Sequence, residues 1–192
     1  MKRFMKIVVI GFLVTFFTQN CFADDYDFRK TKWGMSKAQV KSSESLVITE
    51  EREKNLFYKT RILNKNVALL YKFINNQLVA SYYMILETHT NKNDFIDDYD
   101  TFKNTLTKKY GKPKMDKIVW KNDLYKDDYS SWGMAISVGH LVYASTWEVP
   151  NTEIGNMLHG ENYNISYVVT YESKKLKGLK EKVEEKEALD AL

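Results

Sequence analysis

Apolar and polar side chains alternate in several segments between Leu56 and Tyr171, as in β-strands with one buried and one wet side. The alternation is cleanest near its end, where one parity reads Tyr163, Ile165, Tyr167, Val169 and Tyr171. Strands joined by short turns pair with their neighbours in antiparallel fashion. The pattern therefore predicts an antiparallel sheet as the main element of the fold.

Two helices interrupt the strands. The first is predicted over 37–45, because Ser36 and Gln39 have the spacing of a capping box. The second is predicted over 94–110, where apolar residues recur on one helical face. These residues are Phe95, Tyr99, Phe102, Leu106 and Tyr110.

The ends of the second helix are marked by their own signals. Asn93 is its expected N-cap, and Gly111 followed by Pro113 is its expected stop. Acidic residues in the first turn and Lys108 and Lys109 in the last turn match the helix dipole.

The alternation and the turn residues divide the rest of the domain into strands. Asn75-Asn76 and Gly139-His140 are expected as two-residue hairpin turns. The expected strands are 46–49, 56–62, 67–74, 77–86, 117–121, 132–138, 141–149, 153–158 and 163–171. This order predicts an α+β fold with an antiparallel sheet of about eight strands and two main helices. A duplicated α-β4 unit is one way to build it.

The first 23 residues have the three-part layout of a secretory signal peptide. Basic residues precede an apolar run at 7–17, and Cys21 and Ala23 fit the small positions before a cleavage between Ala23 and Asp24. The run covers about half of a ~30 Å hydrocarbon core, so a membrane anchor is the weaker interpretation. Lipidation of Cys21 is a third alternative, although Thr18 stands where lipoproteins carry leucine.

The expected organisation is a signal peptide over 1–23, one α+β domain over 24–172 with possible halves 33–90 and 91–172, and a charged tail over 173–192. The tail is expected to be a solvated helix with a thin apolar stripe that adds little to the core.

Removal of the signal peptide changes the charge of the chain. The full chain has 29 Lys and Arg against 25 Asp and Glu, and residues 1–23 hold three basic residues and no acid. The processed chain would carry 26 against 25, a net charge of +1, which does not favour nucleic acid as a partner. Cys21 is the sole cysteine and would leave with the signal. We therefore expect a periplasmic or secreted bacterial protein without a transmembrane segment after processing.

The residue types of catalytic and metal sites do not form motifs in this sequence. His89, His140 and His159 lack metal-ligand spacing, so three unrelated histidines are favoured over a three-histidine site at one sheet edge. Helix-dipole compensation and a polar loop explain the acidic residues better than a calcium site. These are Asp94, Asp97, Asp98, Asp100, Asp123, Asp127 and Asp128. The sequence thus predicts no catalytic residue, no metal and no cofactor, and it leaves the binding residues unknown.

Aromatic residues make up 14% of the chain, including 13 tyrosines. Tyrosines on strands can form a stacking surface for a glycan or peptide. They can equally pack a sheet against helices, and this interpretation is favoured because most share a parity with Ile, Val and Trp.

Three segments, FRKTKWGMSKAQVKSSE, LTKKYGKPKMDKIVW and GHLVYASTWE, resemble a group of small uncharacterised exported bacterial proteins over most of residues 28–172. The helix start GMS-x-x-x-V and the helix end YGKP are more distantly similar to BamE-like (SmpA/OmlA) envelope modules. The helix-plus-four-strand repeat resembles the beta-lactamase-inhibitor-protein type of fold. These resemblances imply an interaction module and carry over no site residues.

The leading hypothesis is a non-enzymatic binding module of the bacterial envelope, with an envelope protein or glycan as partner. The alternative is a hydrolase of a cell-wall polymer that uses a Glu or Asp with His140 or His159. The oligomeric state is left open.

Overall fold

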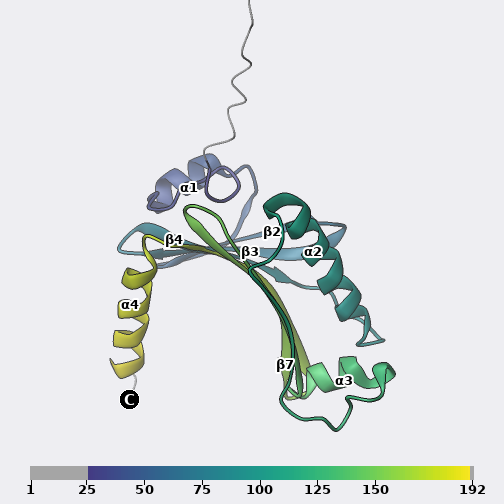
Figure 1. Ribbon diagram of the computed structural model, residues 1–192. Coiled ribbons are helices and arrows are strands. Elements are labelled where there is room, and N and C mark those ends of the chain that lie inside the picture. The colour runs from purple at the N-terminus through teal and green to yellow at the C-terminus, as the bar shows by residue number, and fades with distance from the viewer. Residues whose placement is uncertain (1–25, 191–192) are drawn as a thin grey trace, which may run out of the picture.

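The computed structural model describes residues 26–190, so the expected signal peptide, Cys21 and the cleavage between Ala23 and Asp24 lie outside the described residues. The described chain forms one eight-stranded sheet with helices on both sides (Figure 1). The strands are β1 Ile48–Arg52, β2 Asn55–Ile62, β3 Lys65–Ile74, β4 Gln77–Ile85, β5 Met115–Trp120, β6 Leu141–Glu148, β7 Thr152–Glu161 and β8 Asn164–Ser173. The helices are α1 Lys37–Ser43, α2 Asp94–Tyr110, α3 Trp132–Ser137 and α4 Lys177–Asp190, with a 3-10 turn η1 at Tyr129–Ser131.

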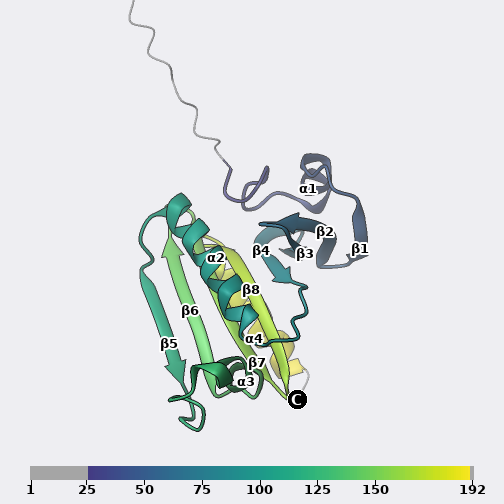
Figure 2. The same ribbon diagram turned by 90° about the vertical axis from the view of Figure 1, so that its right-hand side faces the viewer.

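The strand order is β1-β2-β3-β4-β8-β7-β6-β5, and every neighbouring pair is antiparallel. This confirms the predicted α+β class. The first half of the chain is α1 followed by β1–β4. In the second half α2 is followed by β5, and then η1 and α3 precede β6–β8. The halves join where β4 pairs with β8. The edges of the sheet are β1 and β5 (Figure 2).

The main core lies between the sheet and α1, α2 and α3, which share one side of it (Figure 1). We call this side the helix face. The predicted stripe of α2 is buried there, and its rings meet tyrosines of the strands edge to face. Tyr143, Tyr167 and Tyr171 are buried in this core. The interpretation of the tyrosines as core residues is therefore confirmed for these three.

The helix starts were predicted with mixed success. The capping box of α1 is present, with the Ser36 hydroxyl accepting from the Gln39 amide and the Gln39 side chain accepting from the Ser36 amide. Asn93 is the N-cap residue of α2, as predicted, but its side chain makes no capping bond. Its Oδ1 accepts instead from the amide of Gly133 at 2.6 Å, which ties the start of α2 to α3.

The strand predicted over 132–138 is wrong, since these residues form α3. Gly139 has φ +81° and follows the helix, and its amide donates to Ile136 O at 2.9 Å. Gly139-His140 is therefore a helix C-terminus and not a hairpin turn. Ala135 and Ile136 are fully buried, so α3 closes the end of the core near β6 and β7.

Two strand boundaries also differ from the prediction. Residues 50–52, which lie beyond the predicted strand 46–49, belong to the edge strand β1, where charged side chains face solvent. Tyr163, the first residue of the predicted strand 163–171, is 70% exposed with φ +65°, because it belongs to the turn Asn162-Tyr163 before β8. The predicted turn at Asn75-Asn76 is confirmed, with positive φ at both residues.

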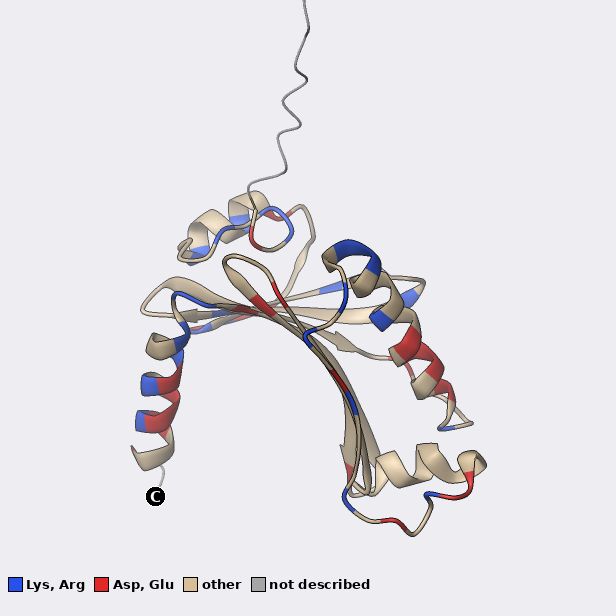
Figure 3. Cartoon of the chain, viewed as in Figure 1, with Lys and Arg blue, Asp and Glu red and all other residues tan. Residues whose placement is uncertain are grey.

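The tail forms the helix α4, which lies on the side of the sheet opposite the other helices (Figure 1). Leu176, Leu179 and Val183 pack against a small second core of Ile74, Val79 and Ala80. Its charges alternate in sign (Figure 3), and ion pairs tie it to the sheet, including Lys180–Glu172 at 2.6 Å. The predicted helix is present and none of its residues is fully buried, but its apolar stripe packs on the sheet through these three side chains.

Candidate functional site

The side of β6, β7 and β8 that faces away from α2 and α3 meets α4 at one end, where Lys177 and Lys180 pair with Glu153 and Glu172. The middle of these strands lies clear of α4 (Figure 1). The burial of these strands alternates, so every second residue points to this side. These outward residues are small or apolar at the centre of the strands. Met84 of β4 and Ala68 of β3 continue this side of the sheet, because Val168 pairs with Met84 and Met84 with Ala68. We call the whole set the open face, and it comprises Val142, Ala144, Thr146, Gly155, Met157, Val168, Thr170, Met84 and Ala68.

Strand pairing aligns part of the open face into one row across the sheet. Ala144 pairs with Met157, Met157 with Val168, Val168 with Met84, and Met84 with Ala68. The row ends in lysine on both sides, because Lys117 pairs with Ala144 and Lys59 with Ala68. Met157 is 38% exposed at the middle of this apolar row.

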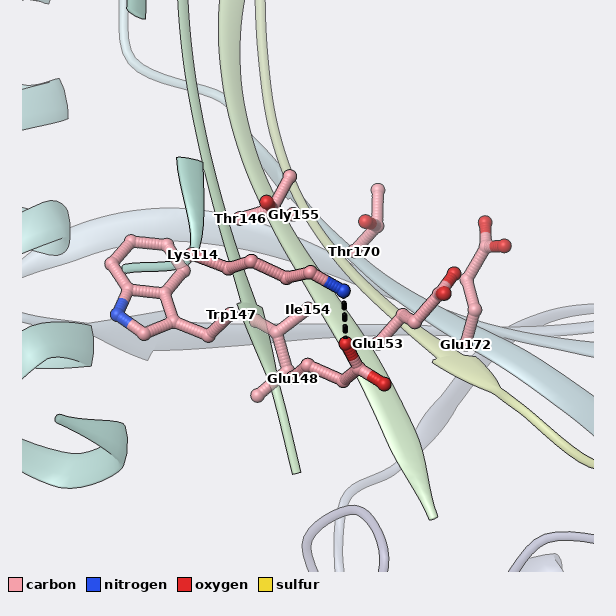
Figure 4. Close-up of a pocket in the computed structure, with 9 residues that line it drawn as sticks. All are labelled: Lys114, Thr146, Trp147, Glu148, Glu153, Ile154, Gly155, Thr170 and Glu172. Atoms are coloured by element: carbon pink, nitrogen blue, oxygen red, sulfur yellow. Dashed lines mark hydrogen bonds and ion pairs between the residues drawn. The ribbon is translucent and has the colours of Figure 1, made fainter. Parts of the chain in front are cut away.

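A pocket of about 370 Å³ lies on the open face beside this row (Figure 4). Its lining includes Thr146, Gly155 and Thr170, which pair in sequence across β6, β7 and β8. A Cβ at Gly155 would lie 2.6 Å from Thr170 Oγ1, so only glycine fits this position without a shift of the threonine. The absence of a side chain at Gly155 leaves the space that forms this pocket.

The rim of the pocket is charged and paired. Glu148 forms ion pairs with Lys114 and Lys174, Glu153 forms one with Lys177, and Glu172 forms one with Lys180. Hydrogen bonds from Lys114 and then Lys174 lower the pKa of Glu148 to about 2, so its carboxylate stays charged at any physiological pH. Figure 4 shows Lys114 reaching Glu148, while the Trp147 ring points to the opposite side of the sheet.

A second pocket, of about 620 Å³, lies on the helix face between residues 26–29, the end of α2 and residues 149–152. Its polar groups bond one another: Arg29 Nε donates to Glu44 Oε2 at 2.8 Å, and Asn151 Nδ2 donates to Asp27 Oδ1 at 3.0 Å. Burial raises the pKa of Glu44, but the bonds from Arg29 and Tyr71 outweigh it and the pKa is lowered. We interpret this pocket as scaffold because its charges are satisfied within the fold.

The three histidines lie at separate places. His89 Nε2 is 2.8 Å from Asp98 Oδ2, so the structure does pair a histidine with an acid. Asp98 also forms an ion pair with Lys65, at 2.6 Å. Asp98 is buried on α2, and neither pocket is lined by this cluster. His140 lies against the Tyr125 ring, and His159 is on β7. The pair expected for a hydrolase, with His140 or His159, is not formed among the described residues.

The acidic residues considered for a metal fall into the two predicted groups. Asp94 and Asp97 lie in the first turn of α2, while the other end carries Lys108 and Lys109 (Figure 3). Asp128 caps η1 by accepting from the Ser130 amide at 3.0 Å. Within residues 26–190, no three His, Asp or Glu side chains come together as metal ligands do.

Comparison of the chain with family models, curated proteins and solved structures gives no match. Among residues 26–190, no helix has the length and apolar character needed to cross a membrane.

The open face was not predicted from the sequence, although a signal for it was present. The outward parity of β2 includes Lys59 and Arg61 beside Asn55 and Phe57, as expected for a strand side in water. The outward residues of β6 are Val142, Ala144, Thr146 and Glu148, and only Glu148, at the end of the strand, carries a charge. Uncharged residues on the wet parity indicate a surface that is used for contact.

Proposed function

We propose that this chain is an exported bacterial envelope protein that binds a partner protein, without catalysis, through the open face. The observation that carries the proposal is the apolar row from Ala144 to Ala68, which crosses the side of the sheet that α4 covers only in part. An apolar centre inside a polar rim is the anatomy of a protein interface. The layout at the N-terminus supports export.

The chemistry of the open face favours a protein over a glycan. Glycan sites use exposed aromatic rings, but the tyrosines of β6 and β8 point into the core, and Tyr82 packs beside α4. The lysines at both ends of the row favour a partner segment that is apolar in the middle and acidic at its ends. The hydrolase alternative draws less support, because the close acid–histidine pair found among residues 26–190, His89 with Asp98, lies outside both pockets.

The export part of the proposal predicts a processed chain that begins at Asp24. The intact mass of the protein recovered from the envelope or the medium measures this directly. A chain that retains Met1, or one that carries lipid on Cys21, would contradict the predicted cleavage.

The binding part is tested by site-specific photo-crosslinking in the cells that export the chain. A photoreactive residue at Met157, on the open face, is expected to give one adduct of discrete mass. The same residue at Thr101, exposed on α2, is the matched control and is expected to give none. Adding Ala144→Arg to the Met157 probe should abolish the adduct, since a charged side chain would stand in the apolar row.

Three results would overturn this proposal. They are equal adducts from Met157 and Thr101, survival of the adduct in the Ala144→Arg chain, and no adduct from any of Val142, Met157 and Val168. The melting temperature of Ala144→Arg must stay near that of the wild type for the comparison to hold. Met157→Arg replaces it if that condition fails.

A further inference from the structure

The two edges of the sheet differ in how they are protected. Edge strand β1 presents Glu50, Glu51 and Arg52, and Glu51 is paired with Lys41 at 2.9 Å. Its register with β2 also shifts between Ile48 and Glu50. Charged side chains and irregular register are the usual protection of a free edge against further pairing.

Edge strand β5 is less protected. It carries two charged residues, Asp116 and Lys117, but its register with β6 runs without a shift from Met115 to Trp120. Ile118 is 52% exposed and Val119 is 41% exposed, on opposite sides of the strand. Figure 2 shows no described element beyond β5. A regular and uncovered edge with exposed apolar side chains is a template for another strand.

The outward hydrogen-bonding groups of β5 can be assigned from its pairing. The amide of Lys121 donates to His140 O at 2.7 Å, and these residues continue the register of β5 with β6. In an antiparallel ladder the bonded residues alternate, so 119, 117 and 115 also face β6. The amide and carbonyl groups of Asp116, Ile118 and Trp120 therefore point away from the sheet.

Apolar side chains extend the surface around this edge. Trp120 meets the Trp132 ring at 5.4 Å, and Trp132 meets Tyr129 at 5.0 Å. Exposed apolar residues gather just beyond the strand in sequence. They are Leu124, Tyr129 and Met134.

We propose that β5 pairs with β5 of a second copy of this chain, antiparallel about a two-fold axis at Ile118. Ile118 would then face its own copy, Asp116 would face Trp120, and Lys117 would face Val119. All three outward residues of each strand would bond their counterparts, and the two sheets would become one.

The self-pairing register fits the charges of the strand. No two like charges stand opposite one another in it, and like charges directly opposite would be destabilising. Asp116 is already engaged within its own chain, accepting from Ser145 Oγ at 2.7 Å and lying 3.5 Å from Lys103. The net charge of +1 expected for the processed chain gives little repulsion between copies. This inference does not depend on the open face.

Cysteine substitution tests the axis directly. In the full chain with Cys21→Ser, Ile118→Cys introduces the sole thiol. Bonded antiparallel residues have Cα atoms about 5.5 Å apart, which a disulfide can bridge. We expect Ile118→Cys to form a covalent dimer on air oxidation. Asp116→Cys would lie about 14 Å from its copy and should form no covalent dimer, and Val47→Cys, an exposed thiol elsewhere, should form none either.

Light scattering gives the second readout. At high concentration, the wild-type protein is expected to have twice the mass of one chain. Ile118→Pro is expected to have the mass of one chain, because proline removes the outward amide of residue 118 and no hydrogen bond to β6. Ile118→Lys serves if the proline variant does not fold. A wild type that stays monomeric throughout its soluble range, a dimer that survives both variants, or equal crosslinking by Val47→Cys would overturn the proposal.

Discussion

Replacing Phe102 with alanine is expected to lower the free energy of unfolding by about 3–5 kcal/mol. Phe102 lies at the middle of α2, is 4% exposed and meets the Tyr167 ring edge to face at 5.5 Å. The substitution would leave a cavity between α2 and β8, because the neighbouring rings cannot all move into the space. Denaturant unfolding monitored by tryptophan fluorescence measures the change.

Thr101→Ala is the control for Phe102→Ala, since Thr101 is the exposed neighbour on the same helix. Its effect should stay within about 0.5 kcal/mol. Equal unfolding midpoints for the two variants would mean that α2 does not dock on the sheet through this face.

The same substitution at two glycines is expected to have opposite effects. Gly133→Ala in α3 should cost about 1–3 kcal/mol, because its Cβ would lie 2.3 Å from the carbonyl carbon of Lys92 and 2.5 Å from the amide nitrogen of Asn93. These are backbone atoms, so α3 or the start of α2 must shift. Gly178→Ala in α4 meets nothing within 4 Å and should gain up to about 1 kcal/mol from helix propensity.

Thermal and denaturant unfolding of the two glycine variants, side by side, checks this pair. The sign of each change is the informative quantity. A Gly133→Ala chain as stable as the wild type would show that α3 is not held against the loop before α2.

Helix α2 was predicted with its exact bounds because several independent local signals agree. Its apolar stripe sets the length, Gly111 and Pro113 stop it, and the charges at its ends match the dipole. Strand β2 was predicted within one residue at its start, since Lys59 and Arg61 mark its wet side. Such features depend only on neighbours in sequence.

Helix α3 could not be predicted from the same kind of pattern. Its six residues alternate large and small, and so short a run fits a strand as well as a helix. What decides the conformation is a distant contact, the approach of Gly133 to Lys92 and Asn93. The amide of Gly133 donates to Oδ1 of Asn93 there, which also explains why the Asn93 side chain makes no capping bond to α2.

The open face was beyond prediction for a related reason. Its row depends on the pairing of β4 with β8, two strands that are far apart in the chain. The uncharged outward residues of β6 were visible in the sequence, but their alignment with Met157, Val168 and Met84 requires the strand order.

Methyl resonances of residues adjacent in sequence test the binding surface most directly. Val168 and Met157 lie on the open face, while Val169 and Leu158 are the next residues and are buried in the core. On addition of the purified crosslinked partner, we predict that Val168, Met157 and Ala144 methyls shift while those of Val169 and Leu158 move much less. Unchanged Val168 and Met157 methyls, with shifts confined to α1, α2 or residues 26–31, would contradict the assignment of the open face as the binding surface.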